Sequence, residues 1–523
     1  MSGEKVVVPR WCDLPLALQE NRLRRGIPRV AALTAEARRE FTECAVAYTQ
    51  QYAPAASPVD PNAPLVLTGH QPGIPHPGVW LKNFAADAVA KRANGWAANV
   101  IIDGDLCRVP GIRVPTGDLE SPQVTSILYD DVAEACPWED RQLLSQERWR
   151  QFGQTVSTAC ADLAPEPIIG DWWQLAAERG IAAGNPGLGL SQGRHLLERS
   201  WGLGTLELPQ STMCETDSFR RFVWMLVATS RRFRECYNAA LASYRKEHRI
   251  RNHAHPVPNL EEDEAWIEVP LWLWSRSDPR RRAAWVRQTP SGWEISDRDS
   301  LTLAIDAKAP DASDPLGSME AAPHRAIEAF SDWRDSGVRV RSRALATTLY
   351  MRLFLADLFL HGIGGAHYDR VTDALCRDYF GFDLFQYATL SGTLRLPGAP
   401  KAIEDRRPHW RNEIRRWRYH PETLLDLDSL PARDRRRAEE AAMRKSHWVK
   451  TPSRTALAAE RHRQISNANS DLQQFLAAER SVIETALASA GTQYRNDESL
   501  GSREFAFCLF PQSKLRDFVL DFA

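Results

Sequence analysis

A loop rich in glycine and proline holds the residues of this chain that are best suited to chemistry. It lies within Leu65–Asn83, which reads LVLTGHQPGIPHPGVWLKN. Glycine lets a backbone approach a ligand closely, and the amides at the start of the helix predicted after Gly78 favour an anion such as phosphate. Side chains at the strand end and one turn into that helix can add charge and hydrogen-bond donors. The residues that we assign to the site here are Gly69, His70, Gln71, Gly73, Lys82 and Asn83.

Within this loop, His70 receives a catalytic role and the other residues a binding role. The pair His70 and Lys82 is expected to supply the positive charge for the anion. The same stretch also fits a rigid connection, because three prolines stiffen a turn and both His76 and Lys82 can be solvated. The residue types alone leave these two interpretations open.

Two aspartates mark the end of the next apolar run, Ala97–Asp103: Asp103 is its last residue, and Asp105 follows after Gly104. A carboxylate after a buried strand can bind a ribose hydroxyl, an amine or Mg²⁺. We assign Asp103 to catalysis and Asp105 to binding. The alternative is an ordinary turn, since Asp-Gly is a common turn dipeptide.

A second glycine loop, HGIGGAHYDRVTD over His361–Asp373, also leads into a predicted helix. We assign Gly364 and Gly365 to the opposite wall of the cleft that holds His70. A histidine on an apolar strand, such as His361, is more often a hydrogen-bonded core residue than a ligand.

We assign no metal site, because the nine cysteines are scattered and form neither a CxxC pair nor a cluster with histidine at zinc spacing. Reduced, structural thiols are the expected state. The cofactor is left open: ATP or another nucleotide fits the loops, and Mg²⁺ is compatible with the aspartates.

These residues need a strand, a helix and a second strand to position them. The sequence predicts strands over Pro64–Thr68 and Ala97–Asp103 and a helix that begins near Gly78. Parallel strands joined by a helix imply a right-handed crossover, and ligands bind at the carboxyl ends of such strands. Both the loop and the aspartates would lie at that edge.

The chain is long enough for several structural units. We expect a helical segment over 1–60, the α/β core over 61–400 with an insertion at about 121–330, an α-helical coiled coil over 401–490, and a segment over 491–523 that returns to the core. Within the insertion we expect a plain loop at Gly184–Leu190 and one long helix over Glu215–His248. We also expect strands over Ala265–Trp274 and Ala284–Ile295 around DPRRR, with a hairpin at TPSGW.

The charge balance points to a small-molecule partner. The 66 basic and 67 acidic residues nearly cancel, which argues against nucleic acid or an anionic membrane as the main partner. The sequence shows neither a membrane-spanning apolar run nor the apolar core of a signal peptide, so we expect a cytoplasmic protein. The charged helical segment is compatible with a homodimer that forms through it.

Several segments together resemble the bacillithiol-synthesis cysteine-adding enzyme family. They are TGHQPGIPHPGVWLKN followed by VIIDGD, the stretch RSRALATTLYMRLFLADLFLHGIGGAHYDRV with its paired glycines, and the terminal LFPQSKLRDFVL. This chain has His70 where the family has glutamine, and it keeps only Asp103 and Asp105 of a more acidic strand end.

The resemblance implies a Rossmann-like core of the nucleotidyltransferase type, with an inserted connecting region and an α-helical coiled coil. It also implies a carbon–nitrogen ligase that joins cysteine to the amine of glucosaminyl malate. The alternatives are nucleotidyl transfer, formation of a different amide, and a non-catalytic nucleotide-binding scaffold.

Overall fold

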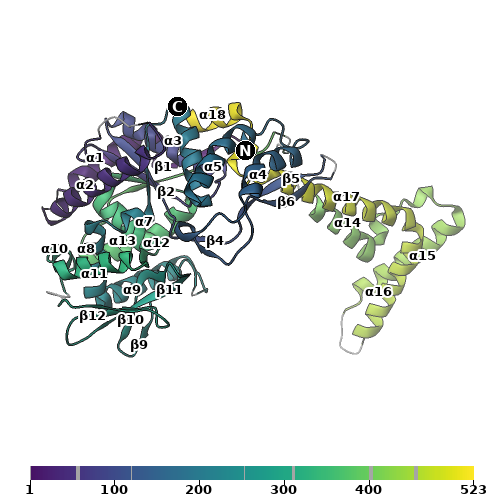
Figure 1. Cartoon of the computed structure of the whole chain (residues 1–523). Coiled ribbons are helices and arrows are strands. Elements are labelled where there is room, and N and C mark those ends of the chain that lie inside the picture. The colour runs from purple at the N-terminus through teal and green to yellow at the C-terminus, as the bar shows by residue number, and fades with distance from the viewer. Residues whose placement is uncertain are drawn as a thin grey trace. The chain divides into compact units, whose positions relative to one another are not determined.

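The computed structural model describes residues 2–26, 28–54, 59–118, 121–252, 254–308, 313–397, 399, 405–452 and 457–522 (Figure 1). The chain divides into two compact units. The first comprises residues 1–117, 124–397 and 503–523, and the second comprises 118–123 and 398–502. None of the helices in the described part of the chain is long and apolar enough to span a membrane.

The first unit is built on a six-stranded sheet that is parallel except at one edge. In spatial order its strands are β1 (Lys5–Val8), β16 (Tyr387–Gly392), β15 (Leu358–His361), β2 (Leu65–His70), β3 (Trp96–Ile101) and β8 (Leu206–Pro209). Only β1 runs antiparallel to its neighbour, and β2 pairs in parallel with β3. The helix α3 (Pro77–Arg92) joins these two strands. The predicted strand, helix and parallel strand are therefore confirmed.

The order of the parallel strands reverses beside β2. From β2 the chain moves outward through β3 to β8, and it later returns to place β15 and then β16 on the other side of β2. In open α/β sheets, ligands bind outside the carboxyl ends of the strands at such a reversal. Here that point lies between β2 and β15.

Helices cover both faces of this sheet (Figure 1). Alternate residues of a strand point to opposite faces, and so Val66 packs with α1 (Leu14–Arg24) and α3, whereas Leu65 and Leu67 pack with α2 (Pro28–Gln50). The expected helical segment 1–60 thus supplies α1 and α2. It also supplies β1, because the run KVVV is β-branched and favours a strand.

A second sheet is formed by strands between residues 262 and 342, so it extends past the insertion expected at about 121–330, and that range also contains β8 of the central sheet. The second sheet is antiparallel, with the order β13 (Thr302–Ile305), β12 (Trp293–Ser296), β11 (Asp278–Gln288), β10 (Trp266–Ser275) and β14 (Val338–Ser342), and β9 (Glu262–Asp263) pairs with β10. The expectation that DPRRR separates two strands is wrong, since this segment begins β11. The predicted hairpin at TPSGW is confirmed, because β11 and β12 pair in antiparallel fashion around the turn at residues 289–292.

The predicted loop Gly184–Leu190 is also wrong, because α6 (Pro186–Ser200) begins within it. The side chain of Asn185 accepts a hydrogen bond from Leu188 N at 3.0 Å, and proline occupies the first helical position. Both are recognised signals of a helix start.

The single long helix expected over Glu215–His248 is two helices, α8 (Asp217–Ala228) and α9 (Ser230–Glu247). The break is Thr229, whose backbone leaves the helical region and whose hydroxyl donates to Met225 O at 2.7 Å. Threonine often competes in this way with the backbone bonds of a helix.

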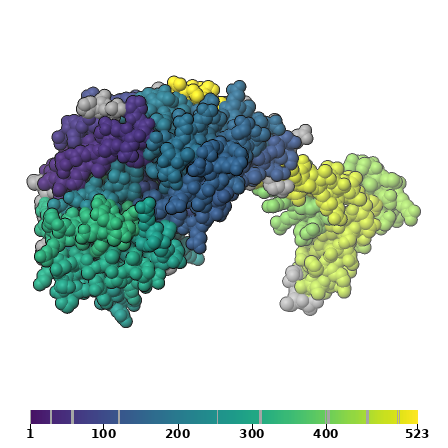
Figure 2. Space-filling model, viewed as in Figure 1, coloured from purple at the N-terminus to yellow at the C-terminus, as the bar shows by residue number. Residues whose placement is uncertain are grey.

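The other helices of the first unit are α4 (Gln146–Ala159), α5 (Ile169–Ala183), α7 (Gln210–Met213), α10 (Pro315–Glu320), α11 (His324–Asp335), α12 (Ala344–Tyr350), α13 (Ile363–Phe380) and α18 (Gln512–Leu520). The short strand pairs are β4 (Leu106–Cys107) with β7 (Cys136–Pro137) and β5 (Gly111–Thr116) with β6 (Gln123–Leu128). The end of the chain packs on the core, as predicted: Phe507 stacks on Trp80 with ring centroids 4.2 Å apart, and α18 lies against α3. The yellow atoms at the top of the first unit in Figure 2 belong to this end of the chain.

The second unit is helical. It contains α14 (Arg407–Tyr419), α15 (Ala432–Lys450), α16 (Ala458–Gln473) and α17 (Ala477–Gly501). The helix α14 packs against α17, and α15 packs against α16. Because α17 continues to Gly501, the segment that returns to the core begins at Arg503 and not at 491.

One buried carboxylate joins four elements of the first unit. Asp357 is 1% exposed and precedes β15. It pairs with Arg38 of α2 at 3.0 Å, with Arg22 of α1 at 3.1 Å and with Arg25, the residue after α1, at 3.7 Å. It also accepts a hydrogen bond from Leu65 N, at the start of β2, at 2.8 Å.

We predict that Asp357→Ala lowers the free energy of unfolding by roughly 3–5 kcal/mol, because it leaves buried arginines without their carboxylate. Urea denaturation followed by circular dichroism measures this change. The matched control is Asp131→Ala, which removes an exposed carboxylate paired with Arg148 at 3.0 Å and should leave the midpoint nearly unchanged. Equal midpoints for Asp357→Ala and the parent protein would contradict the prediction.

Candidate functional site

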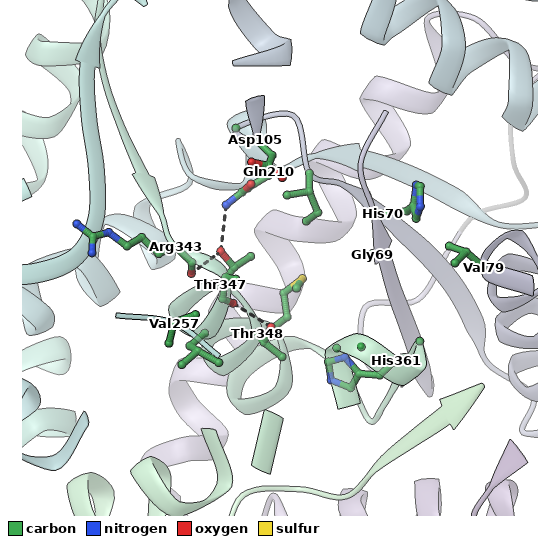
Figure 3. A pocket seen from close by; sticks show the side chains of 18 of the residues that line it. Gly69, His70, Val79, Asp105, Gln210, Val257, Arg343, Thr347, Thr348 and His361 are labelled. Atoms are coloured by element: carbon green, nitrogen blue, oxygen red, sulfur yellow. Dashed lines mark hydrogen bonds between the residues drawn. The ribbon is translucent and has the colours of Figure 1, made fainter. Parts of the chain in front are cut away.

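A cavity of about 700 Å³ lies at the carboxyl edge of the central sheet, where the strand order reverses. The ends of β2 and β15 bring His70 and His361 to it, and the second sheet brings Trp272, Arg281 and, just after β14, Arg343. In Figure 3, His70 and His361 lie on one side of the cavity and Arg343 on the other.

Six of the predicted site residues line this cavity: Gly69, His70, Lys82, Asp105, Gly364 and Gly365. The expectation that the two glycine loops share one cleft is confirmed. The other four, Gln71, Gly73, Asn83 and Asp103, do not line it.

Lys82 is a buried cation at the cavity wall. It is 5% exposed, and its Nζ donates to Gly69 O at 2.9 Å. The other lining cations pair with carboxylates: Arg281 with Asp105 at 3.1 Å, Arg343 with Glu268 at 2.7 Å, and Arg503 with Glu504 at 3.1 Å. In the described part of the chain, no carboxylate makes an ion pair with Lys82. Burial, and then the nearby Arg194, lower the pKa of Lys82 to about 8.

His70 does not supply positive charge at neutral pH, contrary to the prediction. Burial, and then the nearby Lys82, lower its pKa to about 3. Its Nδ1 lies 2.6 Å from Gln71 O. A carbonyl oxygen can only accept, so Nδ1 carries the proton and Nε2 is left as an acceptor. Of the predicted pair, Lys82 alone is the cation.

The helix start that was expected to bind an anion is already capped. His76 Nδ1 accepts from Gly78 N at 3.2 Å, and His76 O accepts from Val79 N at 3.0 Å. Gly78 approaches another backbone and not a ligand, since a Cβ there would lie 1.9 Å from Gly392 O. The helix start that meets the cavity is that of α13, whose first residues include Gly364 and whose N-cap, Gly362, has no side chain.

Asp103 makes hydrogen bonds to the neighbouring helix α7. Its carboxylate accepts from Ser211 N at 2.8 Å and from the Ser211 hydroxyl, which ties the end of β3 to α7. Burial raises its pKa, against the effect of these hydrogen bonds. The structure therefore gives Asp103 a positioning contact outside the cavity, where a catalytic contact was expected.

Of the other three predicted residues, Asn83 and Gln71 make hydrogen bonds outside the cavity, and Gly73 lies near Trp138. Asn83 faces away from the cavity and donates to Glu198 at 2.8 Å, within a buried polar cluster that includes Arg194. The amide of Gln71 donates to Asp105. A Cβ at Gly73 would lie 3.8 Å from the Trp138 ring.

The wall from the second sheet was missed by sequence reasoning. The guanidinium groups of Arg281 and Arg343 lie 4.8 and 4.2 Å from the ring centroid of Trp272. Arg281 also donates to Gly104 O at 2.8 Å, and so connects this sheet to the loop after β3. No local spacing signals this wall, because its residues come from separate strands of the insertion. Among the described residues, no group of three or more His, Cys, Asp or Glu side chains forms a metal site.

We predict that Lys82→Met stabilises the protein by roughly 1–3 kcal/mol at pH 7, because it removes a buried charge with a lowered pKa. Between pH 8 and about 10.5 the unfolded chain binds more protons at Lys82 than the folded one. The stability of the parent protein should therefore rise in that window relative to the variant, and the difference should be largest below pH 8. Urea denaturation at pH 7 and 9.5 measures both values. A variant that is less stable than the parent at pH 7 would contradict the prediction.

Comparison of the chain with models of protein families gave no match, and comparison with curated proteins gave none either.

Proposed function

We propose that this chain is a carbon–nitrogen ligase with a Rossmann-like core that binds an anionic small molecule in the cavity at the carboxyl edge of its central sheet. The anion is the phosphate of ATP or another nucleotide, or the carboxylate of a substrate. The observation that carries the proposal is Lys82, a buried cation that lines the cavity and has no carboxylate partner among the described residues. Burial of an unpaired charge is costly, and a bound anion would compensate it.

The order of the strands supports this assignment. The five parallel strands follow the order of a doubly wound dinucleotide-binding sheet, in which the ligand lies where the order reverses. The cavity lies at that reversal, and the start of α13 opens onto it. A helix start favours an anion through its free amides and its dipole.

The proposed reaction rests on the resemblance of the loop sequences to the bacillithiol-synthesis cysteine-adding enzyme family. We propose that the enzyme joins an amino acid, cysteine by resemblance, to the amine of an aminosugar conjugate such as glucosaminyl malate. The cavity has two walls, which would suit two substrates. The wall with Lys82 offers positive charge for an anion. The wall with Trp272 offers an aromatic ring flanked by two arginines, each of which pairs with a carboxylate. The cavity volume of about 700 Å³ is adequate for small-molecule substrates.

We predict that ATP, and pyrophosphate as a simpler probe, raise the melting temperature of the parent protein. Lys82→Ala should weaken ATP binding about tenfold or more, because it removes a charged hydrogen-bond donor from the site. Calorimetric titration of ATP, with and without Mg²⁺, measures the dissociation constants.

The matched control is Lys91→Ala, in the same helix, whose side chain is 59% exposed and pairs with Asp87 at 2.6 Å. This variant should bind ATP like the parent. If Lys82→Ala and Lys91→Ala weaken binding equally, or if neither nucleotides, cysteine nor aminosugar conjugates stabilise the parent protein, the proposed function is wrong.

A further inference from the structure

A second histidine meets the cavity, and an aspartate fixes its orientation. His361 ends β15, and its Nε2 lies 2.8 Å from Asp369 Oδ2 in α13. A carboxylate that is ionised can only accept, so Nε2 carries the proton and Nδ1 keeps its lone pair. The hydrogen bond therefore selects one tautomer of the ring.

Asp369 is itself held in place. It is buried and pairs with Arg352, which also pairs with Asp373 at 2.8 Å. Burial raises the pKa of Asp369, but Arg352 and His361 outweigh it and keep the carboxyl ionised. The charged groups near the imidazole are thus Asp369, Asp373, Arg352 and, across the cavity wall, Lys82. Burial lowers the pKa of His361 despite the opposing effect of Asp369, so the ring is neutral at pH 7.

The other ring nitrogen lies beside a glycine at the cavity. A Cβ at Gly365 would be 2.9 Å from His361 Nδ1, so any larger residue would displace the ring. His361 lines the cavity although it is only 6% exposed. Among the described residues no hydrogen bond engages Nδ1.

His195 shows what a purely structural histidine looks like in this fold. It is 0% exposed and does not line the cavity. Its Nδ1 lies 2.8 Å from the Tyr52 hydroxyl and its Nε2 lies 3.0 Å from Thr205 O. Both nitrogens of His195 are engaged, whereas only one nitrogen of His361 is.

We propose that His361 is the proton acceptor of this site and that Asp369 positions it, an inference that rests on the proposed amide-forming function. The substrate amine attacks the carbonyl carbon of an acyl phosphate or acyl adenylate. The new C–N bond forms as the acyl C–O bond breaks, and the electron pair of that bond leaves with the phosphate oxygen. The proton lost by the amine goes to Nδ1 of His361, and Asp369 stabilises the imidazolium that results.

Diethyl pyrocarbonate, which acylates accessible and unprotonated imidazole nitrogens, tests the geometry without any substrate. We predict that peptide mass spectrometry finds His361 acylated at pH 7 and His195 unmodified in the native protein. Saturating ATP should slow the acylation of His361. An unmodified His361, under conditions in which exposed histidines react, would overturn the inference.

Two variants test whether Asp369 orients the imidazole of His361 or whether that ring is only accessible to the reagent. Asp369→Asn removes the ionised acceptor that selects the tautomer, and Gly365→Ala places a methyl group against Nδ1. Each should slow the acylation of His361 about tenfold or more, and because Gly365→Ala leaves the buried ion pair of Asp369 in place, it serves if Asp369→Asn fails to fold. Asp378→Asn, an exposed position of the same helix, is the control and should leave the rate unchanged. If Asp369→Asn reacts as fast as Asp378→Asn, Asp369 does not position the ring, and if Gly365→Ala does so, Nδ1 is not the reacting nitrogen; either result overturns the inference.

Turnover completes the test. With cysteine, glucosaminyl malate and ATP, His361→Gln should lower the rate of amide formation by about 10²–10⁴-fold, the usual contribution of a general base, while ATP still raises the melting temperature. An unchanged rate would overturn the inference and leave the proposed function standing. If the parent protein forms no product from these substrates, the proposed function fails, and the acylation of His361 in the parent and the variants decides this inference alone.

Discussion

The buried carboxylate of Asp357 is the constraint on which the arrangement of this fold depends. It bonds Leu65 N at the start of β2, it immediately precedes β15, and it holds arginines from the two N-terminal helices. Because it aligns the starts of two parallel strands, it also sets where they end, with His70 and His361 at the opposite edge. A shift of one residue in this pairing would turn the side chains of a whole strand to the other face. Asp357, at the amino ends of β2 and β15, therefore determines the positions of the site residues at the carboxyl ends of the same strands.

Charge is distributed unequally between the two ends of these strands. At the amino ends, three arginines share Asp357, and this cluster consolidates the packing of helices on the sheet. At the carboxyl ends, Lys82 is buried without such a partner and has a lowered pKa, which is unfavourable for folding. A buried ionisable group that lowers the stability of the fold is typical of a functional site, because a bound ligand can compensate its charge.

Sequence reasoning found the unit β2–α3–β3 because its signals are local: apolar runs, helical spacing and glycine with proline between them. It missed the start of α6, although Asn185 and Pro186 are a recognised helix start, since the glycines that follow suggested a loop. It misjudged His76, His70 and Asp103 for a different reason. Their hydrogen bonds to Gly78, Gln71 and Ser211 depend on how the chain is folded, and residue type does not specify them. The wall with Trp272 comes from a distant insertion that no spacing connects to the loop.

The two histidines at the strand reversal keep lone pairs on opposite ring nitrogens. His70 donates through Nδ1 to a carbonyl and keeps a lone pair on Nε2, whereas His361 donates through Nε2 to Asp369 and keeps one on Nδ1. Both rings have lowered pKa values and are neutral, so the positive charge between them comes from Lys82 and from the start of α13. A cavity with this charge attracts an anion, and its neutral imidazoles accept protons without competing for that anion. In the proposed function this combination would suit a reaction in which a neutral amine attacks an anionic, activated substrate and loses a proton as the new bond forms.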